Sequence, residues 1–167
     1  MGMVSIALVA LGLVGCAEPQ QGNIEEGSGV TWEAAKAAVQ AKTLEIVALI
    51  PGDQVVAVDQ HETGSLFSCD EARHQWTGIT YITLSADADI ESITKNMETQ
   101  LEVILRDHGE FEVTNRRDIF DDYQVTAESA VTSEAYLFGE EEPGLISIDS
   151  WSVCFTLPEG TYPGGSF

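Results

Sequence analysis

The sequence predicts an α+β domain in which two helices pack on one face of an antiparallel sheet, a two-layer sandwich. Two observations lead to this fold class. Apolar residues recur at helical spacing in only two stretches, and the other apolar runs are short and rich in β-branched residues. The order along the chain is helix, strands, helix, strands, which is typical of α+β rather than alternating α/β domains.

The first helix is predicted from Thr31 to about Ile50. Thr31 can cap its N-terminus, and Glu33 suits the positive end of the helix dipole. Pro51 and Gly52 then stop the helix. With a gap at Thr43, the apolar stripe consists of Trp32, Ala35, Val39, Ile46 and Ile50.

The second helix has the clearest periodicity. Asp87 or Asp89 can cap it, Arg106 and His108 suit its negative end, and Gly109 ends it. Its apolar residues form one stripe, consisting of Ile90, Ile93, Met97, Leu101, Ile104 and Leu105.

The remaining apolar stretches are predicted strands. Glu140 to Gly144 is a turn, so the last two strands should pair antiparallel. Alternation in the final strand places Leu145, Ser147, Asp149, Trp151, Val153 and Phe155 on one face, and Ile146, Ile148 and Cys154 on the other. The predicted strands are Val55–Val58, Leu66–Cys69, Thr77–Leu84, Phe111–Thr114, Tyr123–Ala127, Ala135–Phe138 and Leu145–Phe155.

The first 15 residues are a predicted lipoprotein signal peptide. Met3–Leu13 has the length of a signal-peptide core and is too short to cross a bilayer. Leu13-Val14-Gly15-Cys16 matches the lipobox of bacterial lipoproteins, so we expect cleavage before Cys16 and lipid attachment to its thiol. The lipid would hold the protein at the extracytoplasmic face of the cell membrane. Residues 1–5 lack the usual Lys or Arg, so we expect a start codon upstream.

These features divide the chain into four parts. Residues 1–15 are the signal peptide, and residues 16–30 are the lipidated cysteine and a flexible tether rich in Gly and polar residues. Residues 31–158 form a single α+β domain, since that length suits one core. Residues 159–167 are a C-terminal tail without periodicity.

The charge balance excludes one class of partner. Seven Lys and Arg face 28 Asp and Glu, for a net charge of −21. Nucleic-acid binding needs clustered basic residues, whereas Arg116-Arg117 is the only basic pair and Asp118 follows it. We therefore expect no nucleic-acid partner. The acidic surface keeps an exported protein soluble, and its field favours cationic partners over anionic lipid.

With Cys16 lipidated, Cys69 and Cys154 remain as an even pair in an oxidising compartment, which predicts a disulfide. The alternative is a metal site in which both cysteines act with His74 and His61. The chain lacks the short Cys and His spacings of such sites. We therefore expect no metal.

Other motifs that could carry chemistry are weak. Asp87, Asp89, Glu91 and Glu98 resemble a calcium loop, but Ser92 stands where glycine is needed, so helix capping is the better interpretation. Asp118, Asp121 and Asp122 read as solvated loop acids, with weak calcium binding as the alternative. There is no nucleophile motif and no glycine-rich phosphate loop. We therefore expect no catalytic residue and no cofactor.

Aromatic residues offer the remaining candidates for a binding face. Aromatic residues in strands are usually core. Trp76 is the exception that we single out, because it lies at a predicted loop edge after Arg73 and His74, and these three residues form a possible binding surface. The full aromatic set is Trp32, Trp76, Trp151, Tyr81, Tyr123 and Tyr136.

Four segments together resemble small actinobacterial lipoproteins of the LppA-like kind: Gly64–Cys69, Trp76-Thr77-Gly78, the helix end His108-Gly109, and Cys154–Pro158. The resemblance runs from about Val30 to Pro158. It implies an α+β domain on the outer face of the membrane and supports the roles of Cys16, Cys69 and Cys154. It implies no catalytic residue and no settled activity.

Two functional hypotheses follow. The first is a non-catalytic envelope module that the Cys16 lipid holds to the membrane and that binds an envelope protein or another ligand. The alternative is an enzyme that acts on cell-envelope material through paired carboxylates, since 28 acidic residues always offer some pair. A shallow apolar patch would favour the first hypothesis, and a pocket with two facing acids the second.

Overall fold

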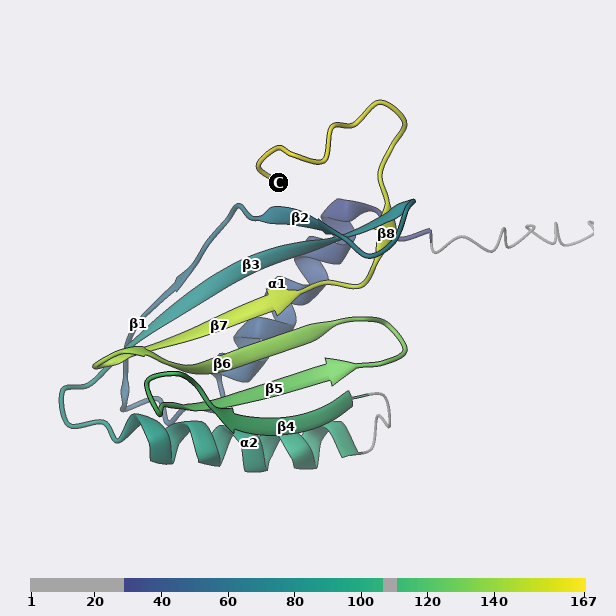
Figure 1. The fold of residues 1–167 in the computed structure, drawn as a ribbon. Coiled ribbons are helices and arrows are strands. Elements are labelled where there is room, and N and C mark those ends of the chain that lie inside the picture. The colour runs from purple at the N-terminus through teal and green to yellow at the C-terminus, as the bar shows by residue number, and fades with distance from the viewer. Residues whose placement is uncertain (1–28, 107–110) are drawn as a thin grey trace, which may run out of the picture.

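A computed structural model describes residues 29–106 and 111–167 (Figure 1). The α+β prediction is confirmed: two helices pack against one antiparallel sheet of eight strands. The helices are α1 (Trp32–Val47) and α2 (Ile90–Arg106). The strands are β1 (Val55–Gln60), β2 (Ser65–Ser68), β3 (Arg73–Leu84), β4 (Phe111–Arg117), β5 (Tyr123–Ser129), β6 (Ala135–Glu142), β7 (Leu145–Trp151) and β8 (Phe155–Thr156).

Strand β3 organises the sheet, whose order is β1-β3-β7-β6-β5-β4. It is 12 residues long, so each of its edges can pair with two strands. One edge pairs with β1 and β2, and the other pairs with β7 and β8. The predicted antiparallel hairpin of the last two strands is confirmed, but β6 continues through Glu142, so the turn is Pro143-Gly144 rather than Glu140 to Gly144.

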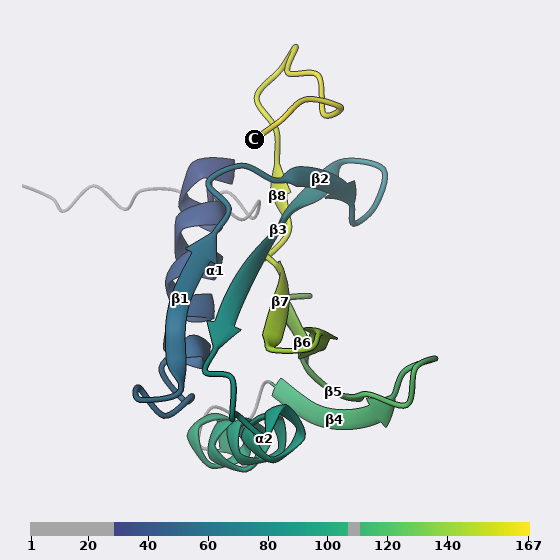
Figure 2. The same cartoon turned by 90° about the vertical axis from the view of Figure 1, so that its left-hand side faces the viewer.

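Both helices lie on the same side of the sheet (Figure 2). Helix α1 covers β3 and β7, and α2 covers β4, β5 and β6. The sheet face that meets them supplies alternate buried residues to the core, as strands with one covered face do. The largest of these sheet residues are Trp76, Ile82, Val125, Tyr136, Phe138, Ile146, Ile148 and Phe155.

The helix starts and the polar gap in α1 follow the sequence, whereas α1 ends at Val47, before the predicted end near Ile50. The Thr31 hydroxyl accepts a hydrogen bond from the Ala34 amide at 3.3 Å, and Asp89 accepts one from the Ser92 amide at 3.0 Å. Both predicted caps are therefore confirmed. Thr43 is buried in the apolar stripe, where its hydroxyl donates to the Val39 carbonyl at 2.9 Å. The Arg106 side chain, His108 and Gly109 lie outside the described residues.

The prediction of one continuous final strand over Leu145–Phe155 is wrong. Strand β7 ends at Trp151, and β8 begins at Phe155. Between them the Ser152 amide donates to the Trp76 carbonyl and the Ser152 hydroxyl accepts from the Trp76 amide, both at 2.9 Å. Because this side chain interrupts the regular ladder, alternation does not continue through the segment. Phe155 pairs with His74 and is fully buried, on the helix side rather than beside Trp151.

The C-terminal segment returns to the domain although it forms no helix or strand. Phe167 and Gly64 exchange two backbone hydrogen bonds, at 2.8 and 3.1 Å. The Phe167 ring meets Trp32 edge-on, with centroids 5.4 Å apart. The segment expected to be a tail therefore covers the start of α1.

The predicted signal peptide, Cys16 and nearly all of the tether lie outside the described residues. Within residues 29–106 and 111–167, neither helix has the length and apolar character needed to cross a membrane.

Candidate functional site

The sheet face turned away from both helices, which we call the open face, is the candidate site. It consists of the residues that alternate with the core positions. Two rows cross its centre by strand register: Thr77–Trp151–Ala135–Glu128 and Ile79–Asp149–Leu137–Thr126. Figure 2 shows β7 and β6 in the middle of the sheet, with both helices on the side opposite the open face.

Trp151 lies between two hollows of the open face. The larger, of about 480 Å³, is mainly polar, and its lining includes Gln75, Arg116 and Glu128. The smaller, of about 400 Å³, is lined by Phe67, Ile79, Asp149 and other residues. Trp151 lines both hollows. Its cross-strand neighbours are the small residues Thr77 and Ala135, so the indole is only half-buried.

Asp149 is the charged residue nearest to Trp151 along β7, two positions before it on the same face. Its cross-strand neighbours are the apolar Ile79 and Leu137. Burial, and then the charge of Glu141, raise the pKa of the Asp149 carboxyl. Among the residues that the structure describes, this carboxylate has no hydrogen bond or ion pair.

The sequence-based choice of Trp76 as a surface residue is wrong. Strand β3 begins at Arg73 rather than Thr77, so Trp76 lies within the strand and faces the helices, where it is 1% exposed. The indole Nε1–H donates to the Phe167 carbonyl at 3.1 Å. Two glycines make room for the ring: a Cβ at Gly64 or Gly78 would lie 2.7 or 2.1 Å from its carbon atoms. Trp76 is therefore a core residue.

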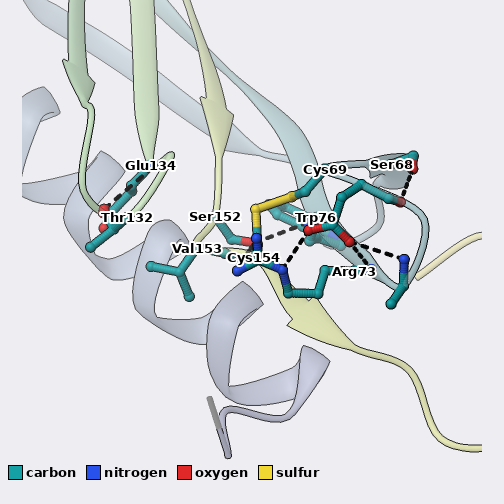
Figure 3. Close-up of a disulfide and its surroundings, with 11 residues drawn as sticks. Ser68, Cys69, Arg73, Trp76, Thr132, Glu134, Ser152, Val153 and Cys154 are labelled. Carbon is teal, nitrogen blue, oxygen red and sulfur yellow. Dashed lines mark hydrogen bonds and ion pairs between the residues drawn. A yellow bond between two sulfur atoms is a disulfide. The ribbon is translucent and has the colours of Figure 1, made fainter. Parts of the chain in front are cut away.

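Arg73, His74 and Trp76 do not form the predicted binding surface. Asp70 accepts hydrogen bonds from the Ala72 and Arg73 amides and a 2.7 Å ion pair from the Arg73 side chain (Figure 3). The Ala72 bond is the main cause that lowers the Asp70 pKa to about 2. Arg73 thus closes the β2–β3 turn. His74 Nδ1 is buried without a hydrogen-bond partner in the described part of the chain.

The predicted disulfide is confirmed. The Cys69 and Cys154 sulfur atoms are bonded at 2.00 Å, and the two Cα atoms are 6.3 Å apart (Figure 3). The bridge joins the end of β2 to the segment between β7 and β8. Because each sulfur is bonded to the other, the alternative in which both thiols hold a metal with His74 and His61 does not apply.

The acidic motifs serve local structure. Asp89 caps α2, and its hydrogen bond from the Ser92 amide is the main cause that lowers its pKa. One Asp118 oxygen accepts from the Phe120 and Asp122 amides and so closes the β4–β5 turn. Within the described ranges, no three His, Cys, Asp or Glu side chains gather as a metal site requires.

A polar cluster joins α2 to strands β4 and β5. Both Glu91 oxygens accept from the Arg117 guanidinium, at 2.6 and 2.7 Å, and Lys95 adds an ion pair at 2.6 Å. The bond from Arg117 is the main cause that lowers the Glu91 pKa to about 2. The Tyr123 hydroxyl donates to Glu98 at 2.5 Å, and burial raises the pKa of Tyr123 to about 12. Each group in this cluster has a partner, so we assign it to packing of the helix.

Trp151 is the functional candidate that sequence reasoning passed over, although a signal for it was present. In the stretch Leu145–Trp151, Ser147 and Asp149 share its face, while Ile146 and Ile148 occupy the other. A tryptophan in phase with polar residues is predicted to face solvent.

Comparisons with known proteins add no family to these observations: no protein-family model, curated protein or solved structure matches the chain. The function is therefore argued from the open face itself.

Proposed function

We propose that the protein is a non-catalytic binding module of the cell envelope, tethered by a lipid on Cys16, which binds its partner with the open face around Trp151. The observation that carries this proposal is the half-buried indole between two hollows, at the centre of a sheet face that neither α1 nor α2 covers. Tryptophans surrounded by complementary contacts near the middle of a patch are the usual anchors of protein interfaces.

The side chains around Trp151 support binding rather than solubility alone. Phe67 is 56% exposed beside the smaller hollow, and Ile79 and Leu137 add apolar surface on either side of Asp149. A face that only had to be soluble would gain nothing from a tryptophan and a phenylalanine at these positions. Apolar centres with polar surroundings are characteristic of interaction sites.

The same geometry favours binding over the enzyme hypothesis. Each hollow is lined by a single carboxylate, Asp149 in the smaller and Glu128 in the larger. Carboxylate catalysis needs an acid and a base around one reacting bond, in a site that excludes water. Both hollows of the open face are broad and shallow, and neither presents that pair. A third hollow, of about 470 Å³, is lined by Asp53, Asp87 and Asp89, but it lies at the start of α2, where Asp89 is engaged as the helix cap.

The binding claim is tested by site-specific photo-cross-linking of the full chain in its host cells. A photoreactive phenylalanine replaces Leu137 on the open face or, as a matched control, the exposed Glu102 on α2. We expect a discrete adduct from position 137 that Trp151→Ala abolishes, and no such adduct from position 102. Equal adducts at both positions, or an adduct unchanged by Trp151→Ala, would overturn the proposal.

The anchor is tested separately. Cys16→Ser removes the thiol that would receive the lipid, so the variant should appear in the soluble fraction without palmitate label. A serine variant that still fractionates with membranes contradicts lipid anchoring, and it leaves the open-face claim to the cross-linking result.

A further inference from the structure

The Asp149 carboxylate lies half-buried on a central strand, and within residues 29–106 and 111–167 no side chain or backbone group pairs with it. Its cross-strand neighbours are Ile79 and Leu137, whose side chains cannot form hydrogen bonds. An ionised carboxylate in such surroundings is costly unless a cation compensates it. The position is therefore suited to a positive charge that none of the described side chains provides.

The basic side chains that the structure describes are all engaged elsewhere. Arg116 comes nearest, as part of the lining of the larger hollow, but it lies on the edge strand β4 and donates to Gln124 at 3.4 Å. The others are Lys36 over Trp76, Lys42 on Glu45, Arg73 on Asp70, and Lys95 and Arg117 on Glu91. Since no basic side chain that the structure describes supplies this cation, we infer that it comes from a partner.

Trp151 specifies what kind of cation fits. Residues two apart on a strand share a face at about 7 Å, so the indole and the Asp149 carboxylate are adjacent on the open face. A guanidinium can stack on the indole and donate two parallel hydrogen bonds to the carboxylate. An ammonium matches this combination less well, because it is a compact charge without a planar face.

The surroundings point to a peptide segment as the source of the guanidinium. Alternate side chains of an extended peptide also repeat at about 7 Å, so an apolar side chain two residues from an arginine can reach the hollow beside Phe67 and Ile79. The net charge of −21 attracts basic segments over a longer range. Glu128 and Glu141 are exposed near this face, and both add to that attraction.

We propose that the open face binds an extended, arginine-containing segment of a partner protein, with the guanidinium between Trp151 and Asp149 and an aliphatic side chain in the hollow beside Phe67. This proposal rests on the proposed function, and it adds the chemistry of the partner.

The test uses the full chain labelled with 5-fluorotryptophan, whose three tryptophans give three ¹⁹F signals. Trp151→Phe identifies the signal of Trp151. The probe is a capped pentapeptide with arginine at its centre, a leucine at each end and serines between. Its control replaces arginine with citrulline, which has nearly the same shape but no charge. We expect the arginine peptide to shift the Trp151 signal at up to millimolar concentration, with the citrulline peptide about tenfold weaker.

Two variants decide whether Asp149 is responsible. Asp149→Asn should remove the preference for arginine over citrulline. Glu102→Gln removes the same charge from the exposed side of α2 and should leave the preference intact. If both variants weaken arginine binding equally, only the overall charge acts and the proposal fails.

Three further outcomes contradict the proposal while remaining distinct from failure of the proposed function. Equal shifts of Trp151 by both peptides would retain the open face as a binding surface but reject the cation. N-acetylarginine amide binding as tightly as the pentapeptide would reject a peptide segment. If neither peptide shifts the Trp151 signal, the arginine segment is rejected, and cross-linking from position 137 still decides the proposed function.

Discussion

Trp76 and Trp151 lie on adjacent strands, β3 and β7, but their side chains face opposite sides of the sheet. Trp76 faces the helices, is 1% exposed, and has a hydrogen-bond acceptor for its indole in Phe167. Trp151 faces away from the helices and has open space on both sides of its ring. The two faces of the sheet therefore differ in packing. One face forms the core, and on the other a large aromatic side chain is only half-buried.

Small neighbours produce both environments, but by different means. Gly64 and Gly78 lie against the flat Trp76 ring, and the indole occupies the space that side chains at these two positions would fill. Thr77 and Ala135 flank Trp151, and no side chain in the described part of the chain fills the space that they leave. Tight packing on one face and hollows on the other predict distinct responses to mutation.

The largest effect should come from deleting the two indoles in turn. Trp76→Ala removes a fully buried aromatic side chain and should lower the free energy of unfolding by about 3–5 kcal/mol. Trp151→Ala removes a half-buried one and should lower it by less than about 1.5 kcal/mol. Urea denaturation of both variants measures the difference. Equal losses would show that Trp151 is also a core residue.

The disulfide should be next in size. Replacing Cys69 and Cys154 together by alanine removes a cross-link between residues 85 positions apart, so the unfolded chain gains conformational entropy. The free energy of unfolding should fall by about 2–5 kcal/mol. The bridge lies next to Ser152, which hydrogen-bonds to the backbone of Trp76. We therefore expect the lost stability to come from the core face of the sheet, where Trp76 lies. Reduction of the unmodified protein serves as the control and should lower the denaturation midpoint in the same direction. An unchanged midpoint in both experiments would contradict a stabilising bridge.

Filling the space beside Trp76 should have an intermediate effect. In Gly78→Ala the new Cβ would lie 2.1 Å from the Trp76 ring, which must shift, at a cost of about 1–3 kcal/mol. Gly52→Ala is the matched control, because a Cβ there meets nothing within 4 Å. Thermal unfolding of both variants tests this prediction. If Gly78→Ala unfolds at the same temperature as Gly52→Ala, the close fit around Trp76 is wrong.

The smallest effect concerns Asp149, and its sign depends on pH. Burial and the charge of Glu141 raise the pKa of Asp149 in the folded state above its unfolded value. Its ionisation therefore destabilises the fold as pH rises through the folded pKa, whereas the protonated form, below the unfolded pKa, carries no such cost. Asp149→Asn should raise the melting temperature at pH 7 but not below the ordinary aspartate pKa of about 3.9. A lower melting temperature at pH 7 would mean that the carboxylate has a stabilising partner.

Much of the fold could be predicted from the sequence because local patterns determine it. The Thr31 and Asp89 caps, the stripe along α2 apart from the exposed Ile104, and the turn at Pro143-Gly144 act over a few residues. The start of β3 could not be predicted in this way. Arg73 to Trp76 contains three polar residues and becomes strand because β2 pairs with it across a tight turn and β8 pairs with it from the far end of the chain.

The site was harder to predict for the same reason. Trp76 was chosen because its neighbours resemble a loop, but its burial depends on Phe167, 91 residues away along the chain. Trp151 was available from alternation in β7. The hollows beside it depend on which residues of β3 and β6 stand opposite, and that register is set by the whole sheet.

The most direct test of the account combines stability and binding in two conservative variants, Trp76→Phe and Trp151→Phe. Each is placed in the chain that carries the photoreactive group at position 137, and both the urea midpoint and the adduct yield are measured. We predict that Trp76→Phe lowers the midpoint and retains the adduct, whereas Trp151→Phe retains the midpoint and loses most of the adduct. If the adduct instead follows the midpoint in both variants, or is lost only with Trp76, the two faces do not have the separate tasks assigned to them.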